Sequence, residues 1–302
     1  MMKIFTLLAT SLTVAIAVVV GQAQQPATST GGLNTAAIDQ ALGLTGQMQG
    51  DVYRVGIPRT DLSVTVHGIA IKPGLALGSW AAFRHAGAAA VVDGDLVVTE
   101  PEINPLISKL QEGGFQITAL HNHLIEETPS LMYVHYWGEG PEATLARNLR
   151  TALQVTKTPL TPAAAPAPGA PVPDPGFDAD AIQKGLGKTG TVRGGVLAIS
   201  VPRPEKIMMM GVELPPAMGM ATALNFQSAG NGKVAATGDF VMIDSEVNPV
   251  AKAMRAHGIA ITSLHSHMIH GDPVLYFMHF WAEDTAPNVA AGLKAALDLL
   301  KK

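Results

Sequence analysis

The chain has 302 residues, ten histidines, no cysteine and a formal net charge of −4 at pH 7. At roughly 100–200 residues per domain, this length predicts two domains. The absence of cysteine excludes disulfides, thiolate metal ligands and cysteine nucleophiles, and the acidic balance offers no basic surface of the kind that binds nucleic acid. Any chemistry must therefore come from histidine, carboxylate or hydroxyl groups.

Residues 1–23 have the pattern of a secretory signal peptide. Lys3 precedes an apolar run over residues 4–20, and Gly-Gln-Ala at residues 21–23 gives a small-x-small cleavage pattern. The run is at the short limit for crossing a bilayer, so a membrane anchor is the alternative interpretation. We expect export to the periplasm or outside the cell, and no stable membrane span after cleavage.

The first repeat, residues 33–156, predicts short helices and strands in mixed order. Helices are expected over residues 34–42, capped by Asn34, and over 103–111 and 142–154, with a helical turn over 77–83. Strands are expected over residues 51–57, 62–71, 115–125 and 131–137, and as a hairpin of 88–92 with 95–99 around Asp93-Gly94. Because strands and helices do not alternate regularly, we predict an α+β fold with a mixed, largely antiparallel sheet and packed helices.

The second repeat, residues 177–302, matches the first at a constant offset of 144 positions. The match is densest between residues 94–138 and 238–282, and such self-similarity predicts two tandem copies of one fold. Residues 157–176 between them are rich in proline and alanine, which favours a semi-rigid linker. Nothing in this linker requires the two domains to touch.

Two histidine triplets stand at equivalent positions of the repeats. They follow the pattern H-x-H-x11-H and comprise His121, His123 and His135 in the first repeat and His265, His267 and His279 in the second. Residues i and i+2 of a strand point to the same face, so the two histidines of each H-x-H project together. If Ile125 pairs with Leu131, His121 lies directly opposite His135, with Cβ atoms about 4.5–5.5 Å apart.

Three neutral imidazoles on a rigid face can bind zinc and leave a position open for water or substrate. Imidazole also suits other divalent transition metals, so zinc is the first expectation and another such metal the alternative. A third possibility is that the histidines are buried, satisfied by hydrogen bonds and inert.

Carboxylates and a tyrosine near the triplets are the candidate catalytic residues. Glu102 and its counterpart Glu246 could act as general acid or base, or could complement a helix dipole from its first turn. Tyr133 is expected on the same side as His135, as a proton donor in the first repeat only or as a core aromatic. Asp95 and Asp239, each directly after a glycine, indicate turns.

Residues 94–140 and 238–284 resemble the LppY/LpqO family of exported bacterial proteins. The most specific part is Ala-Leu-His-Asn-His at residues 119–123 with the histidine downstream, and the second repeat has Ser-Leu-His-Ser-His in its place. The resemblance implies a tandem architecture and export, but no established activity. A weaker likeness, to acetolactate decarboxylase, lies in an H-x-H and a later histidine that hold zinc from adjoining strands.

These features favour an exported protein with a three-histidine metal site in each repeat, acting as a metal-dependent hydrolase or lyase on a small molecule. The alternative is a non-catalytic module that binds metal or a small ligand. A structural or interaction protein with inert histidines is the third hypothesis. The sequence predicts neither the substrate nor the oligomeric state.

Overall fold

Each repeat folds around one six-stranded antiparallel sheet. In a computed structural model that describes residues 32–87, 89–161 and 174–301, the two sheets have the same strand order. The first sheet contains, in spatial order, β1 (Gln47–Gln49), β2 (Val52–Pro58), β5 (Gly78–Ala86), β6 (Ala89–Thr99), β9 (Leu131–Gly140) and β7 (Gln116–His121). The second contains β10 (Thr191–Arg193), β11 (Val196–Pro202), β14 (Ala221–Gly230), β15 (Lys233–Met242), β18 (Tyr276–Thr285) and β16 (Ala260–His265). The predicted α+β class with two tandem repeats is confirmed.

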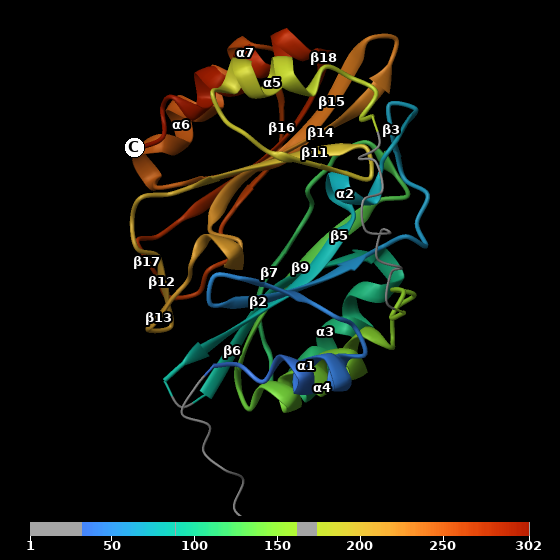
Figure 1. The fold of residues 1–302 in the computed structure, drawn as a ribbon, viewed down its shortest axis with the longest axis vertical. Coiled ribbons are helices and arrows are strands. Elements are labelled where there is room, and N and C mark those ends of the chain that lie inside the picture. The colour runs from blue at the N-terminus through green and yellow to red at the C-terminus, as the bar shows by residue number, and fades with distance from the viewer. Residues whose placement is uncertain (1–31, 88, 162–173, 302) are drawn as a thin grey trace, which may run out of the picture. The chain divides into compact units, whose positions relative to one another are not determined.

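The helices of each repeat cover one face of its own sheet (Figure 1). They are α1 (Thr35–Leu42), α3 (Ile103–Glu112) and α4 (Glu142–Leu153) in the first repeat, and α5 (Ala179–Leu186), α6 (Asp244–Ala256) and α7 (Ala286–Leu297) in the second. Leu145 and Leu149 of α4 are buried in one cluster with Val92 of β6 and Val134 of β9. Because alternate strand residues point to opposite faces, the neighbours of these valines turn toward the other repeat.

Local capping signals place helix ends where the sequence predicts them. The Asn34 side chain accepts a hydrogen bond from the Ala37 N–H at 3.1 Å, and Gly43 ends α1 in the left-handed conformation. The helix predicted over residues 103–111 is α3, which ends ahead of Gly113.

Three predicted elements are wrong. The helical turn expected over residues 77–83 is strand β5, and the strand expected over 62–71 is a short hairpin of β3 (Thr65–Val66) and β4 (Ile69–Ala70). The hairpin expected around Asp93-Gly94 is the uninterrupted strand β6. A Cβ at Gly94 would lie 2.5 Å from the Trp80 carbonyl oxygen and 2.4 Å from the Tyr136 hydroxyl. This glycine therefore permits close approach within the sheet, a use of strand glycine that resembles a turn signal in sequence.

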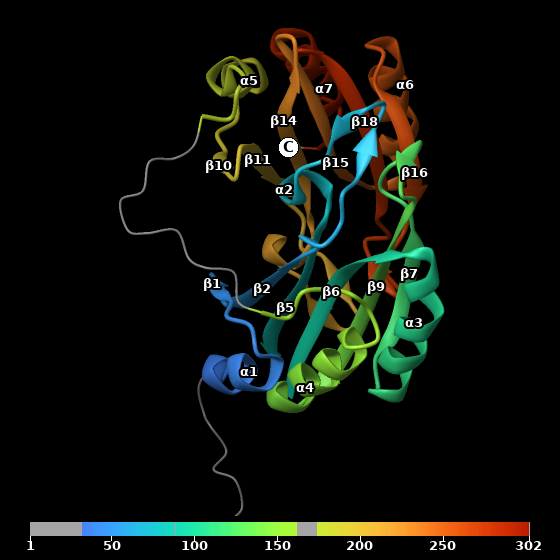
Figure 2. The ribbon, with the colours of Figure 1, turned by 90° about the vertical axis from the view of Figure 1, so that its right-hand side faces the viewer.

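Each repeat extends an arm over the sheet of the other. From the first repeat, α2 (Pro73–Ala76) contacts β14 and β15 (Figure 2), next to the small sheet of β4, β3 and β8 (Glu127–Thr128). From the second, the 3-10 helix η2 (Pro216–Met218) contacts β2, and β13 (Val212–Glu213), β12 (Met208–Met209) and β17 (Gly271–Asp272) form the matching small sheet.

Two apolar clusters join the repeats through these arms. Leu75 of α2 is buried in one cluster with Trp281, and Met209 of β12 is buried in the other with Trp137. Residues Gly32–Lys302 form one compact unit that contains both repeats, a packing that the linker composition left open.

The predicted signal peptide, residues 1–23, and the middle of the predicted linker, residues 162–173, lie outside the described residues. Among the residues that are described, no helix combines the length and the apolar character that a membrane span requires. The predicted repeat limits of 33–156 and 177–302 each enclose one complete six-stranded sheet.

A matched threonine pair tests the packing between the repeats. The Thr262 hydroxyl donates to the carbonyl oxygen of His123 in the other repeat at 2.6 Å, whereas the hydroxyl of its counterpart Thr118 is buried without a partner. We expect Thr262→Val to lower the free energy of unfolding by about 1 kcal/mol, and Thr118→Val to leave it unchanged or raise it. Urea denaturation of the two variants measures the difference, and equal effects would contradict the interface.

Candidate metal centre

The histidines reach the space between the two sheets from equivalent elements. His135 lies on β9, His121 is the last residue of β7, and His123 follows in the loop. The second repeat repeats this placement with His279 on β18, His265 at the end of β16 and His267 in the loop. Val134 and Tyr136 point into the helix-covered core, so His135 between them points to the other repeat.

The strand register differs from the predicted one by two residues. His121 pairs with Tyr133 rather than His135, because β7 ends at His121 and Ile125 lies beyond the sheet. His265 pairs in the same way with Phe277. A shift of two residues leaves every side chain on its original face, so the predicted convergence survives the wrong register.

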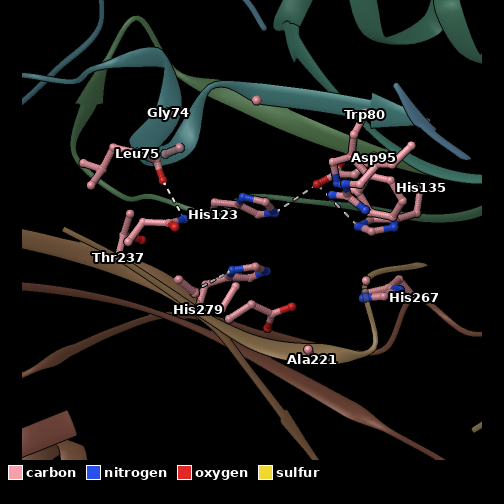
Figure 3. Close-up of a pocket in the computed structure, with 18 residues that line it drawn as sticks. Gly74, Leu75, Trp80, Asp95, His123, His135, Ala221, Thr237, His267 and His279 are labelled. Atoms are coloured by element: carbon pink, nitrogen blue, oxygen red, sulfur yellow. Dashed lines mark hydrogen bonds and ion pairs between the residues drawn. The ribbon is translucent and has the colours of Figure 1, made fainter. Parts of the chain in front are cut away.

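The six rings stack in three pairs across the interface between the repeats. Ring centroids are 3.7 Å apart for His121 and His265, 3.9 Å for His123 and His279, and 3.9 Å for His135 and His267. The offset of 144 positions maps the first pair onto itself and exchanges the other two. The contact is therefore self-complementary, as in a two-fold symmetric dimer. Figure 3 shows His123 facing His279 and His135 beside His267.

Within the described residues, two groups of side chains could each hold a metal ion, because the ligand atoms in each group lie within 4.8 Å of one another. Both groups include His121. One group is His121, His265 and His279, and the other is Asp95, His121 and His135. The first group draws on both repeats, so the donors do not sort into the two triplets that the sequence predicts. His123 and His267 belong to neither group.

A hydrogen bond to the backbone determines which ring nitrogen of His279 is available as a metal ligand. Its Nδ1 lies 3.0 Å from the carbonyl oxygen of Gly238, which can only accept, so Nδ1 carries the proton. Nε2 therefore presents a lone pair, which accepts a hydrogen bond from Nε2 of His265 at 3.0 Å, and a bound metal would take the place of that proton. A backbone carbonyl that orients the far nitrogen in this way is typical of metal-ligating histidine.

Burial keeps the imidazoles neutral. Desolvation, and then the neighbouring His265, lower the pKa of His121 to about 3, and desolvation lowers the pKa of His265 to about 4. The pKa values of His123, His135, His267 and His279 are lowered well below the usual range, with burial as the largest cause in each. Neutral imidazole is the form that binds metal.

Several ligand atoms of this centre are buried without a hydrogen-bond partner. They include Nε2 of His121, Nε2 of His123, Nδ1 of His135, Nδ1 of His265 and one carboxylate oxygen each of Asp95 and Asp239. Unpaired buried polar atoms are costly, and a cluster of them calls for an explanation such as an ion. Burial raises the pKa of Asp239 to about 8 and that of Asp95 well above its usual value, so a cation is the natural compensation.

A cavity of about 220 Å³ opens beside the histidines (Figure 3). Its lining includes three pairs related by the repeat, namely Asp95 and Asp239, His123 and His267, and His135 and His279. A cavity of this size has room for several waters or for a small molecule. Arg54 and Trp80 from the first repeat also line it.

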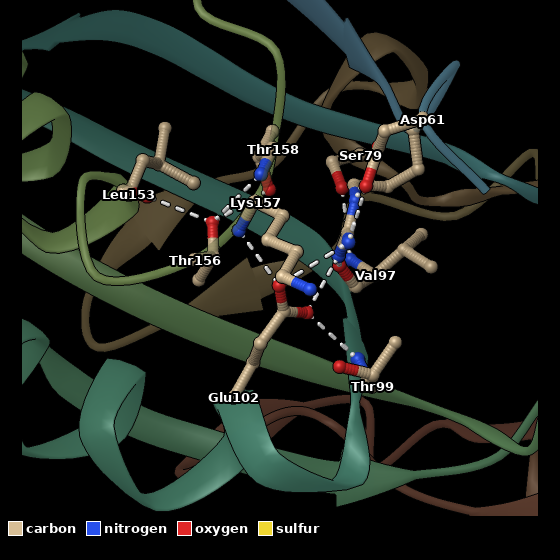
Figure 4. A network of polar contacts seen from close by, with 10 residues as sticks. Asp61, Ser79, Val97, Thr99, Glu102, Leu153, Thr156, Lys157 and Thr158 are labelled. Atoms are coloured by element: carbon tan, nitrogen blue, oxygen red, sulfur yellow. Dashed lines mark hydrogen bonds and ion pairs between the residues drawn. The ribbon is translucent and has the colours of Figure 1, made fainter.

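Glu102 and Glu246 are held in buried ion pairs and belong to neither donor group. The Glu102 carboxylate accepts from Arg59 Nη1 at 2.8 Å and from the backbone N–H groups of Thr99 and Lys157 (Figure 4). Glu246 has the same arrangement with Arg203. Burial alone would raise the pKa of Glu102, but these hydrogen bonds lower it overall. The contacts match the interpretation of both residues as helix first-turn carboxylates.

Tyr133 packs against the histidines without offering its hydroxyl to them. Its ring stacks on His123 with centroids 3.4 Å apart, and its hydroxyl donates to the Ala76 carbonyl oxygen at 2.8 Å. Phe277 packs on His267 at 3.5 Å in the same way. Both repeats therefore share an aromatic ring that packs against the second histidine of the H-x-H motif.

Asp95 and Asp239 belong to the site, although their positions directly after a glycine predicted turns. Asp95 pairs directly with His135 in the sheet, and Asp239 pairs with His279. Oδ2 of Asp95 lies 3.5 Å from Nε2 of His123 and 3.6 Å from Nε2 of His135. The available signal was that Gly-Asp recurs at the repeat offset together with the histidines.

The family described as Domain of Unknown Function (DUF1259) matches the chain twice, over residues 36–155 and 180–299. A search of curated proteins finds no match. EtuB from Clostridium kluyveri is 8% identical over 84% of this chain and 90% of its own, with a TM-score of 0.20. The trimeric bacterial microcompartment shell protein PduB is 10% identical over 84% and 88%, with a TM-score of 0.21. At these TM-scores the two alignments carry no argument about fold or function.

Proposed function

This chain belongs to the family described as Domain of Unknown Function (DUF1259), and we propose that it binds a divalent transition metal between its two repeats. The observation that carries the proposal is the buried set of neutral imidazoles with unpaired nitrogens, gathered around His121. The ligands are His121, His265 and His279, with Asp95 and His135 adjoining them. Nitrogen and oxygen donors without sulfur suit zinc first, and copper, nickel or iron as alternatives.

We propose further that the metal serves a small-molecule reaction, as a hydrolase or lyase. A bound metal would supply Lewis acidity and a water of lowered pKa. The chain's own contribution is a cavity lined by both repeats, in which the carboxyls of Asp95 and Asp239 can hold protons beside the ligands. The cavity beside the histidines favours this function over simple metal storage, and a non-catalytic metal- or ligand-binding module is the alternative.

Export to the periplasm or the exterior is part of the proposal. It is supported by the signal-like pattern of residues 1–23 and by the resemblance to the LppY/LpqO family. Secretion of a reporter fused to residues 1–30, and its loss when the apolar run is interrupted by arginine, tests this part.

Metal analysis of the purified protein tests the central proposal. After reconstitution with Zn²⁺, Cu²⁺, Ni²⁺ or Fe²⁺ and gel filtration, we expect about one tightly held ion per chain, since one ring nitrogen of His121 ligates one ion. Absence of any retained ion would overturn the proposal. If metal is retained, hydrolysis of small esters and cleavage of 2-keto acids, compared with the apo-protein, separate an enzyme from a binder.

A further inference from the structure

A positively charged side chain, Arg54, lines the cavity beside the histidines, and the second repeat has no charged residue at the equivalent position. Arg54 on β2 occupies the place of Ala198 on β11, because each pairs with the first residue of its neighbouring edge strand. Trp80, which pairs with Asp95, likewise occupies the place of Ala223, which pairs with Asp239. One side of an otherwise matched cavity therefore carries a guanidinium and an indole.

The Arg54 guanidinium is fixed in position but only partly used. It lies 3.9 Å from the centroid of the Trp80 ring, and Nη1 donates to the Ala217 carbonyl oxygen at 2.7 Å. These are its direct contacts within the part of the chain that the structure describes. A guanidinium has five N–H donors in a planar fork, so donors remain for a ligand in the cavity.

The charge of Arg54 is not paired within the described residues. No carboxylate there forms an ion pair with this guanidinium, whose hydrogen bond goes to the backbone carbonyl oxygen of Ala217. Burial lowers the pKa of Arg54 to about 10, and the guanidinium therefore stays charged. A positive charge in a small cavity next to neutral imidazoles favours an anionic ligand.

We infer that Arg54 binds the carboxylate of a small organic acid, whose other oxygen-bearing end faces the histidines. A carboxylate matches the guanidinium fork in a bidentate manner. A singly charged carboxylate is favoured over a phosphate dianion, because Arg54 is the one lysine or arginine among the described residues that line the cavity. This inference names the substrate class of the proposed function. It rests on that function only for the claim that the other end of the acid meets a bound metal at the histidines.

Calorimetric titration of the full chain with glycolate, acetate and inorganic phosphate tests the inference. We expect glycolate to bind, and Arg54→Met to weaken its binding about 10- to 100-fold, with Arg54→Lys in between. Arg84→Met is the matched control, because Arg84 Nη1 also donates across the repeats, to the Glu213 carbonyl oxygen, but does not line the cavity. The control should bind glycolate like the natural chain, and circular dichroism and thermal unfolding confirm that each variant is folded.

Glycolate binding that is absent, or unchanged in Arg54→Met and Arg54→Lys, would overturn the inference, as would tighter binding of phosphate. Metal content measured on the same samples keeps the two proposals apart. If the chain retains no metal but Arg54 still controls glycolate binding, the metal proposal fails and the carboxylate site stands. If metal is retained and glycolate binding ignores Arg54, the carboxylate site alone fails.

Discussion

Replacing His121 with alanine should abolish metal binding by the whole chain rather than by the first repeat alone. His121 belongs to both donor groups, and its ring stacks on His265 of the other repeat. Removing one of three protein ligands from a transition-metal site is expected to weaken binding at least about 100-fold, more than the 10- to 100-fold typical of an outer-shell change. Metal content after gel filtration, by inductively coupled plasma mass spectrometry, should fall close to zero.

His123→Ala is the discriminating companion variant. His123 stands two residues away in the same H-x-H motif, yet it lies outside both donor groups. We expect this variant to retain its ion, and His257→Ala, a histidine outside the triplets, to behave like the natural chain. Equal losses in His121→Ala and His123→Ala would instead support a separate three-histidine site in each repeat.

Replacing Glu102 with alanine should cost stability and leave metal content unchanged. The Arg59 side chain is fully buried, and Glu102→Ala would leave its charge without the carboxylate that receives Nη1 at 2.8 Å. Breaking a buried pair from one side typically costs about 3–5 kcal/mol of unfolding free energy when no other partner remains, and Arg59 keeps Asp61 at 2.9 Å, so we expect a cost below that range. Glu246→Ala should have a similar effect through Arg203, which has the equivalent ion pair. Urea denaturation and metal analysis of both variants measure the two outcomes, and lost metal with intact stability would restore a direct role at the metal centre.

The pH dependence of Glu102→Gln gives the same ion pair a second test. The folded-state pKa of Glu102 is lowered, so its contribution to stability is present above the unfolded value of about 4.3 and is lost as the pH falls through the folded-state pKa. The difference in unfolding free energy between the natural chain and Glu102→Gln should therefore be large at pH 7 and shrink below about pH 4. A difference that stays constant down to pH 3 would contradict the assignment.

The sequence could predict that the histidines of each triplet lie on one face, because a register error of two residues leaves every side chain of a strand on the same face of the sheet. His121 and His135 share a face in the predicted pairing and in the observed one. The stacking of His121 on His265 could not be predicted, since it depends on how two sheets pack across a linker whose composition constrains neither distance nor angle.

Turns were predicted at Asp95 and Asp239 because glycine is common in turns, but glycine also occurs in strands where two backbones approach closely. Gly94-Asp95 and Gly238-Asp239 have turn-like composition, but both lie within strands, where a side chain on the glycine would collide with the neighbouring strand. A Cβ at Gly238 would lie 1.8 Å from the Ala223 carbonyl oxygen. Once the glycine is assigned to the strand, the aspartate beside it faces the histidines.

Anomalous scattering from a crystal of the metal-loaded protein tests the shared centre most directly. We predict a metal peak between the two sheets, with nitrogen ligands from His121 of the first repeat and from His265 and His279 of the second. A peak whose ligands all come from one repeat, or metal found only on histidines outside the triplets, would contradict it.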